Sequence, residues 1–106
     1  MFHEWQEYRF VSKIQDKMIV VSYDIADDKL RNRFSKMLTK NGAIRLQYSV
    51  YELNNTMRVM DNLKEKIEVF SKKFSGADSV IIFDVSNVHL KKYGNAIHRD
   101  SDVVYF

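Results

Sequence analysis

The chain contains no cysteine and no proline, and it has only three glycines, at Gly42, Gly76 and Gly94. Without cysteine it can have neither a disulfide framework nor a metal site built from thiolates, and this composition is typical of a cytoplasmic protein. With so few glycines it has no glycine-rich loop that would cradle a phosphate. Each of the three falls where a helix or strand is expected to end.

Other features are also missing. No apolar stretch approaches the ~18 residues that a membrane-spanning helix needs, so we expect no contact with a membrane. The N-terminus lacks the basic-then-apolar order of a secretion signal. The three histidines, His3, His89 and His98, do not have the spacing of metal ligands, and no serine has a visible triad partner.

The 106 residues fit one domain with a thin core, for which dimerisation would add burial. A hydrophobic fraction of 45% is typical of globular proteins and argues against disorder. The 17 Lys and Arg residues outnumber the 14 Asp and Glu residues, which gives a net charge of +3. This mild excess is compatible with a nucleic-acid partner, but whether the protein binds one depends on where the charges are placed.

The apolar patterns predict four strands and two helices. The expected strands are residues 18–25, 43–53, 78–86 and 103–106, and the expected helices run from Asp27 or Asp28 to about Lys40 and from Met57 to Phe74. We expect strands 18–25 and 78–86 to be buried, because both are nearly continuous apolar runs. Asn54 to Thr56 should form a turn and a helix cap.

The helices have apolar faces at helical spacing. These faces comprise Leu30, Phe34, Met37 and Leu38 in the first helix, and Met57, Met60, Leu63, Ile67, Phe70 and Phe74 in the second. The order of elements predicts an α+β fold, a ferredoxin-like βαββαβ sandwich with an extra C-terminal strand. That fold needs two strands between the helices, so residues 43–53 either bend into two short strands or form one long strand with a bulge. Residues 1–17 are expected to be an N-terminal extension of a domain formed by residues 18–106.

Asp24 ends the first predicted strand, a position where sites commonly form. With Asp27 and Asp28 nearby, it could hold Mg²⁺ or Mn²⁺, which prefer oxygen ligands. Alternatively, Asp27 and Asp28 cap the following helix and Asp24 pairs with a neighbouring arginine.

A cationic stripe runs along the first predicted helix. It consists of Lys29, Arg33, Lys36 and Lys40. Alternation in 43–53 places Leu46, Tyr48 and Val50 on one side and Arg45, Gln47, Ser49 and Tyr51 on a polar side. Nearby in the sequence, aromatic surface is added by Tyr23, Tyr48 and Tyr51. Cations neutralise phosphates and aromatic rings stack on bases, so this region could bind nucleic acid; otherwise the stripe is a solvated helix face.

The run YDIADDKLRNRFSKMLTKNGAIRLQYSVYEL, residues 23–53, carries two motifs in order: Y-D-I-x-D-D-x-x-R and R-x-Q-Y-S-V-[FY]-E. Together they resemble the CRISPR-associated protein family two, the small ferredoxin-like proteins of spacer acquisition. The resemblance extends from Met18 to about Val85. Tyr51 stands where phenylalanine is common.

The resemblance implies a symmetric homodimer in which the C-terminal strand completes the partner's sheet. Asp24 would be a metal ligand and catalytic residue, holding Mg²⁺ or Mn²⁺ at the dimer axis opposite its own copy. The family resemblance also implies Mg²⁺-dependent endoribonuclease or DNA-directed nuclease activity and a complex with the CRISPR integrase. The expected nucleic-acid-binding residues are Lys29, Arg31, Arg33, Lys36, Lys40, Arg45, Gln47, Ser49 and Tyr51.

Three functions follow. The chain could be a metal-dependent endonuclease, a DNA-binding scaffold for the integrase, or a toxin-like ribonuclease or regulatory ferredoxin-like module outside CRISPR. A lone aspartate with no nearby His or Lys to act as a general base is poorly equipped for fast hydrolysis. This favours the scaffold function, with weak nuclease activity in addition. The expected partners are a second copy, the integrase, DNA, and single-stranded RNA as a further candidate.

Overall fold

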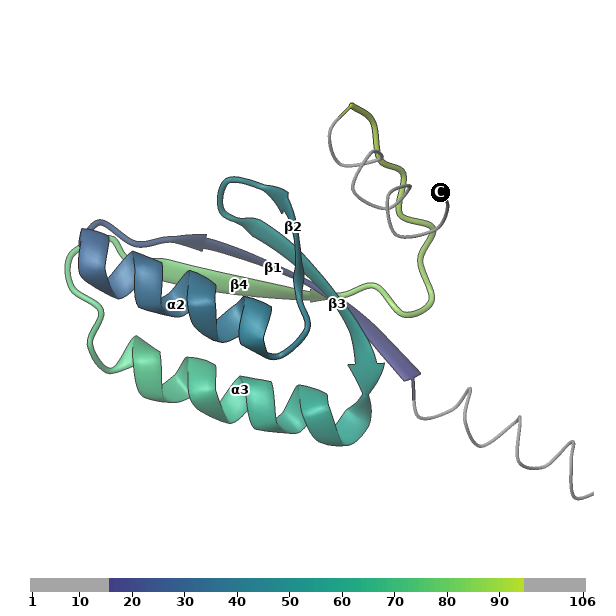
Figure 1. Ribbon diagram of the computed structural model, residues 1–106, viewed down its shortest axis with the longest axis horizontal. Coiled ribbons are helices and arrows are strands. Elements are labelled where there is room, and N and C mark those ends of the chain that lie inside the picture. The colour runs from purple at the N-terminus through teal and green to yellow at the C-terminus, as the bar shows by residue number, and fades with distance from the viewer. Residues whose placement is uncertain (1–15, 95–106) are drawn as a thin grey trace, which may run out of the picture.

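The computed structural model describes residues 16–94. Its elements in chain order are β1 (Asp16–Asp24), α2 (Asp28–Lys40), β2 (Ile44–Gln47), β3 (Val50–Thr56), α3 (Met57–Ser71) and β4 (Ser79–Asp84). The strands of this part of the chain form one antiparallel sheet in the order β2-β3-β1-β4. Both helices lie on the same side of that sheet, as Figure 1 shows. The predicted ferredoxin-like βαββαβ arrangement is therefore confirmed, whereas residues 1–15 and the expected strand 103–106 lie outside the described residues.

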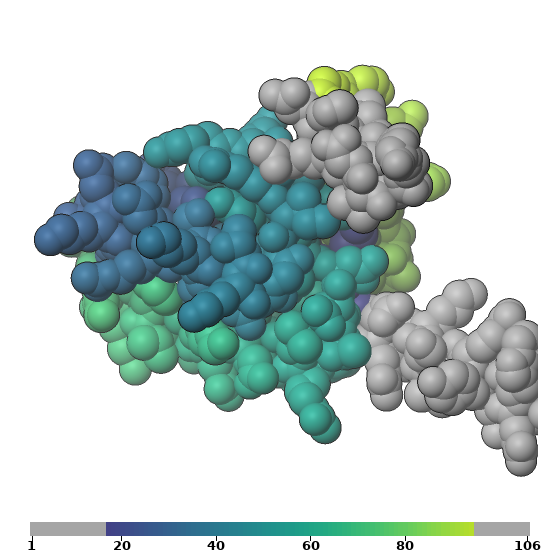
Figure 2. Space-filling model, in the orientation of Figure 1, coloured from purple at the N-terminus to yellow at the C-terminus, as the bar shows by residue number. Residues whose placement is uncertain are grey.

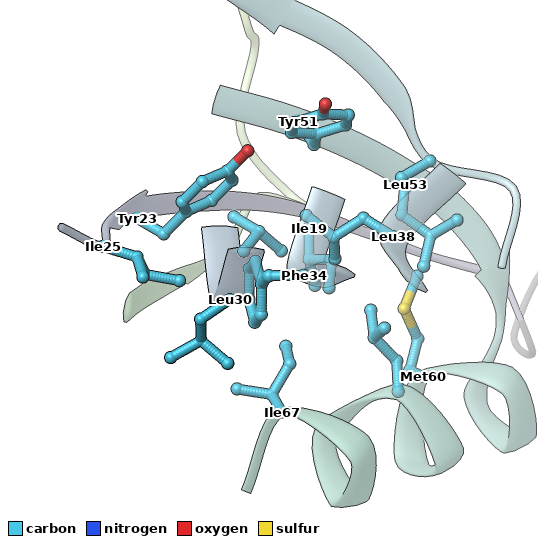
Figure 3. Close-up of a cluster of buried hydrophobic side chains, with 13 residues drawn as sticks. Ile19, Tyr23, Ile25, Leu30, Phe34, Leu38, Tyr51, Leu53, Met60 and Ile67 are labelled. Atoms are coloured by element: carbon cyan, nitrogen blue, oxygen red, sulfur yellow. The ribbon is translucent and has the colours of Figure 1, made fainter. Parts of the chain in front are cut away.

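The core lies between the sheet and the two helices (Figure 3). Alternate residues of β1, namely Ile19, Val21 and Tyr23, point into it because successive side chains of a strand face opposite ways. Phe34 of α2 is fully buried; its ring meets Tyr23 edge-on, with 4.8 Å between ring centroids. The predicted apolar faces of both helices supply the rest of the core, apart from Met57, which is 48% exposed and was wrongly placed there.

Local signals set the ends of α2. Asp27 is its N-cap, and the Asp27 carboxylate accepts a hydrogen bond from the Leu30 N–H at 2.8 Å. At the other end Asn41 is the C-cap, and Gly42 follows with a positive φ of 95°. Such a φ strains any residue with a Cβ, so the Asn41-Gly42 stop is confirmed with its physical reason.

The segment between the helices is a hairpin. Strands β2 and β3 pair antiparallel around a turn at Tyr48 and Ser49, and the register shifts between Arg45 and Gln47. Two strands are therefore present, with an irregularity in one of them. The expected turn at Asn54 to Thr56 is wrong, because β3 continues to Thr56, although Thr56 does cap α3 through its hydroxyl.

The sheet face opposite the helices is covered unevenly. Val20 and Leu46 are buried on it, in a hollow also lined by Leu90 and Tyr93 of the segment after β4. On β4, in contrast, Ile81 is 52% exposed. The expectation of a buried strand at 78–86 is wrong for this face, because in the described part of the chain β4 is an edge strand that is covered only on its helix side.

Candidate nucleic-acid and metal site

One end of the sheet gathers segments that are distant in the sequence. The Tyr23 N–H donates to the Ser49 carbonyl at 3.1 Å, which fixes the β2–β3 turn beside the end of β1. The Ala26 N–H donates to the Asp78 carboxylate at 3.0 Å, which ties the β1–α2 loop to the segment before β4. Asp24 pairs in register with Ser79 at this same end. The polar residues of both sequence motifs therefore meet here.

The Asp24 side chain is exposed. It lies on the sheet face opposite the helices, since Tyr23 next to it points into the core. Within residues 16–94 the Asp24 carboxylate has neither a hydrogen bond nor an ion pair, so the alternative that it pairs with a neighbouring arginine is not what the fold shows.

The neighbouring carboxylates have structural roles. Asp27 caps α2, and Asp28 forms an ion pair with Arg31. Asp78 accepts hydrogen bonds from the N–H groups of Ala26 and Ser75, and these two donors lower the pKa of Asp78 below its usual range. Asp24 is left as the uncommitted carboxylate among these four.

Arg31 fastens the loop between β1 and α2. Its guanidinium donates to the carbonyls of Ile25, at 3.1 Å, and Ala26, at 3.3 Å, and also to the Asp28 carboxylate. The hydrogen bond with Asp28 is the main reason that the pKa of Arg31 lies above its ordinary value, and nearby Tyr48 also raises it. The side chain is only 23% exposed, so we assign it chiefly to positioning this loop.

Arg45 and Tyr48 form a second cationic unit on the hairpin. Arg45 donates to the Tyr48 carbonyl at 3.0 Å, and its guanidinium carbon lies 5.0 Å from the centroid of the Tyr48 ring, within range of a cation–π interaction. The Tyr48 ring is 67% exposed. Gln47 is exposed and Ser49 is half-buried at the same turn. Tyr48 was not among the predicted binding residues, because the strand pattern placed it beside Leu46 and Val50 and hid the turn.

Tyr51 cannot contact nucleic acid as predicted, because it is only 1% exposed. It does share a face with Arg45, opposite it in register, but that face lies under α2. The Tyr51 hydroxyl is hydrogen-bonded to the Ser35 hydroxyl at 2.7 Å. Burial, together with the neighbouring Tyr51, raises the pKa of Tyr23 to about 12. The rings of Tyr23 and Tyr51 lie stacked beneath the site, with 6.1 Å between their centroids, as Figure 3 illustrates.

The predicted cationic stripe of α2 is exposed along its length. Its members are Lys29, Arg33, Lys36 and Lys40. The last three line a groove of about 710 Å³ between α2 and α3, together with Lys66, Met37 and Phe70. Figure 2 shows the side chains of α2 and α3 adjacent on this face. Lys66 joins the stripe only through the packing of the two helices, which no local sequence pattern shows.

The residues of one chain fit a metal ion only in part. Among residues 16–94, no group of three or more His, Cys, Asp or Glu side chains could hold a metal. Asp24 supplies one exposed oxygen ligand of the kind that Mg²⁺ and Mn²⁺ prefer. Further ligands would have to come from water, substrate or a second copy. Within the described part of the chain, no helix is long and apolar enough to cross a membrane.

Comparison with known proteins decides the family. The model of the family described as CRISPR associated protein Cas2 matches residues 17–93. The chain belongs to the Cas2 family. This membership supports a CRISPR-associated role over the alternative of a module outside CRISPR.

Its Cas2 relatives include a CRISPR-associated endoribonuclease Cas2 of Thermus thermophilus, 37% identical over 60 residues, which are 57% of this chain and 63% of the relative. The chain thus matches less than two thirds of that relative's length. The CRISPR-associated endoribonuclease Cas2 2 of Methanospirillum hungatei is 36% identical over 70 residues, covering 63% of this chain and 71% of the relative.

Two solved structures have the same fold. A crystal structure of Cas2 is 25% identical with a TM-score of 0.59, over 74% of this chain and 87% of the other. A hypothetical protein from Thermus thermophilus is 26% identical with the same TM-score of 0.59, over 74% of this chain and 94% of the other.

Proposed function

We propose that this Cas2-family protein is a homodimer that binds nucleic acid and acts as a scaffold for the CRISPR integrase during spacer acquisition. The observation that carries the proposal is the unequal use of charges at the site. Cations are exposed in a row along α2, whereas three of the four carboxylates near the end of β1 are occupied in holding the loops. A surface of this kind is suited to binding a phosphate backbone.

The sheet face opposite the helices, which we call the open sheet face, is suited to dimerisation. Ile81 and Phe83 on β4 are 52% and 50% exposed, and Asp24 lies on the same face. Large apolar side chains exposed side by side are typical of an interaction surface. A second copy packed on this face would bring a second Asp24 carboxylate nearby, and two close carboxylates need a cation or a proton between them.

A Mg²⁺-dependent endoribonuclease is the second candidate function. The relatives are named endoribonucleases, and the uncommitted Asp24 carboxylate is the specific observation that favours it here. Asp24 from each copy would hold Mg²⁺ or Mn²⁺, which supplies activation of water and stabilisation of phosphate charge when bound. Within residues 16–94 no His or Lys contacts Asp24 as a general base, and for this reason we favour the scaffold.

A paired cleavage and binding assay separates the two candidates. Labelled single-stranded RNA and duplex DNA would be incubated with wild type and with Asp24→Ala, each with Mg²⁺ and with EDTA. Asp61→Ala, at an exposed position on α3, is the matched control. The scaffold hypothesis predicts duplex binding that survives Asp24→Ala, with little cleavage. Metal-dependent cleavage that Asp24→Ala abolishes and Asp61→Ala preserves would establish the enzyme instead.

The partner is tested separately by co-purification with a CRISPR integrase. The scaffold requires a complex in which the duplex is bound more tightly than by either protein alone. A failure to co-purify, with duplex binding intact, would remove the integrase from the proposal and leave a nucleic-acid-binding protein.

A further inference from the structure

We infer that Tyr48 is a stacking platform for one unpaired nucleobase, so that the site takes single-stranded nucleic acid at the hairpin turn. The inference rests on the proposed nucleic-acid function and adds a ligand contact to it. Its basis is an aromatic ring that is 67% exposed although its backbone is firmly held.

The backbone that carries the ring is held in place by the surrounding hydrogen bonds. The Tyr48 carbonyl accepts from Arg45 at 3.0 Å, and the carbonyl of the next residue, Ser49, accepts from the Tyr23 N–H at 3.1 Å. These bonds fix the turn to β1, a central strand of the sheet. A ring on such a support loses little conformational freedom when a base stacks on it, which favours binding.

Two cations accompany the ring. The Arg45 guanidinium carbon lies 5.0 Å from the ring centroid, and Arg31 also interacts with Tyr48. A positive charge next to an aromatic ring is the combination by which proteins bind single strands, because the ring takes a base and the cation attracts the adjoining phosphate. In a duplex the bases are already stacked, so the ring adds affinity only for unpaired bases.

Chemistry favours a nucleobase over an apolar protein segment as the occupant. Phe83, an exposed aromatic on β4, sits beside Ile81 in an apolar patch, whereas Tyr48, on the β2–β3 turn, has arginines next to it. The guanidinium groups beside the ring can pair with the phosphates that flank a stacked base, which an apolar protein segment does not offer.

The test measures fluorescence anisotropy of labelled single-stranded RNA and DNA oligonucleotides, together with abasic oligonucleotides of equal length, which keep the phosphates and lose the bases. We expect Tyr48→Ala to weaken binding of the base-bearing strands about 5- to 150-fold and to leave the abasic strands unchanged. Tyr48→Phe should retain affinity because it keeps the ring, and Tyr48→Leu should behave like alanine. Met57→Ala, an exposed apolar position that follows β3 at the opposite end of the sheet, is the control.

Four outcomes would overturn the inference. An equal loss of affinity for base-bearing and abasic strands in Tyr48→Ala would show that Tyr48 contacts phosphates or has a structural role. If sedimentation shows that Tyr48→Ala loses the dimer, and affinity for both kinds of strand falls in parallel, Tyr48 would be a residue of the dimer interface. Unchanged affinity would show that the stacking contact is absent, whereas a wild type that binds neither these single strands nor duplex DNA would overturn the proposed function as well. A stacking effect on RNA alone or on DNA alone would support the inference and identify the strand.

Discussion

The buried hydroxyl of Tyr23 should make the protein sensitive to alkali. Burial against Phe34 and Tyr51 raises the pKa of Tyr23 from 10 to about 12, because the charged phenolate is poorly solvated there. A folded-state pKa above the unfolded value means that the stabilisation is complete below pH 10 and is lost as the pH rises to about 12. Two pKa units correspond to at most about 2.7 kcal/mol. Solvent near the end of the sheet screens part of this, so we expect a loss on the order of 1 kcal/mol.

The assay compares urea unfolding of wild type and Tyr23→Phe at several pH values between 10 and 12. Lysine deprotonation also destabilises a protein in this range, but it affects both chains equally, so the difference between their free energies of unfolding isolates Tyr23. We expect that difference to shift by on the order of 1 kcal/mol against the wild type as the pH rises. Tyr48→Phe, which removes an exposed hydroxyl, is the control. A difference that stays constant across the range would refute the assignment of Tyr23 as a buried, neutral phenol.

Three further predictions concern the core, the cations and the dimer. Phe34→Ala should cost about 3–5 kcal/mol in urea unfolding, because Phe34 is fully buried, whereas exposed Val69→Ala should cost under about 0.5 kcal/mol. Arg33→Glu with Lys36→Glu should weaken duplex binding at low salt and lower the salt slope by about one per lost phosphate contact; an equal effect of Lys72→Glu with Lys73→Glu would mean nonspecific charge. Phe83→Glu should give a folded monomer by sedimentation and circular dichroism, and a dimer that persists would contradict the proposed interface.

The parts of the fold predicted correctly depend on short-range physics. Leu30, Phe34 and Leu38 recur at helical spacing, and the structure buries all three. Asp27 caps α2 because its carboxylate reaches an N–H three residues ahead, which is a purely local geometry. The exposure of Asp24 goes beyond the prediction of a buried strand at 18–25, and it follows from alternation along β1 only because Tyr23 points into the core.

The errors arise where tertiary packing decides the environment. Tyr51 lies on the same face as Arg45, as alternation predicts, but only the position of α2 determines that this face is covered at Tyr51. The hydroxyl of Ser35, sixteen residues away, is what makes burial of a tyrosine acceptable there. Similarly, Ile81 looks like a core residue in the sequence, but among residues 16–94 β4 is an edge strand of the sheet and its outer face is open.

The distribution of hydrogen bonds at the end of β1 explains why one carboxylate is available among several. Arg31 and Asp78 each hold the β1–α2 loop, Arg31 through the carbonyls of Ile25 and Ala26 and Asp78 through the Ala26 N–H. A loop fixed from both sides keeps the preceding residue, Asp24, in one position at the end of the sheet without using its carboxylate. A carboxylate that stays in water has no desolvation penalty. Its electrostatic interaction with another charged group becomes strong only when the two are brought together and lose part of their hydration. If the proposed dimer forms on the open sheet face, Asp24 would supply one half of a shared site, and the groups packed against it would determine whether that site binds a cation.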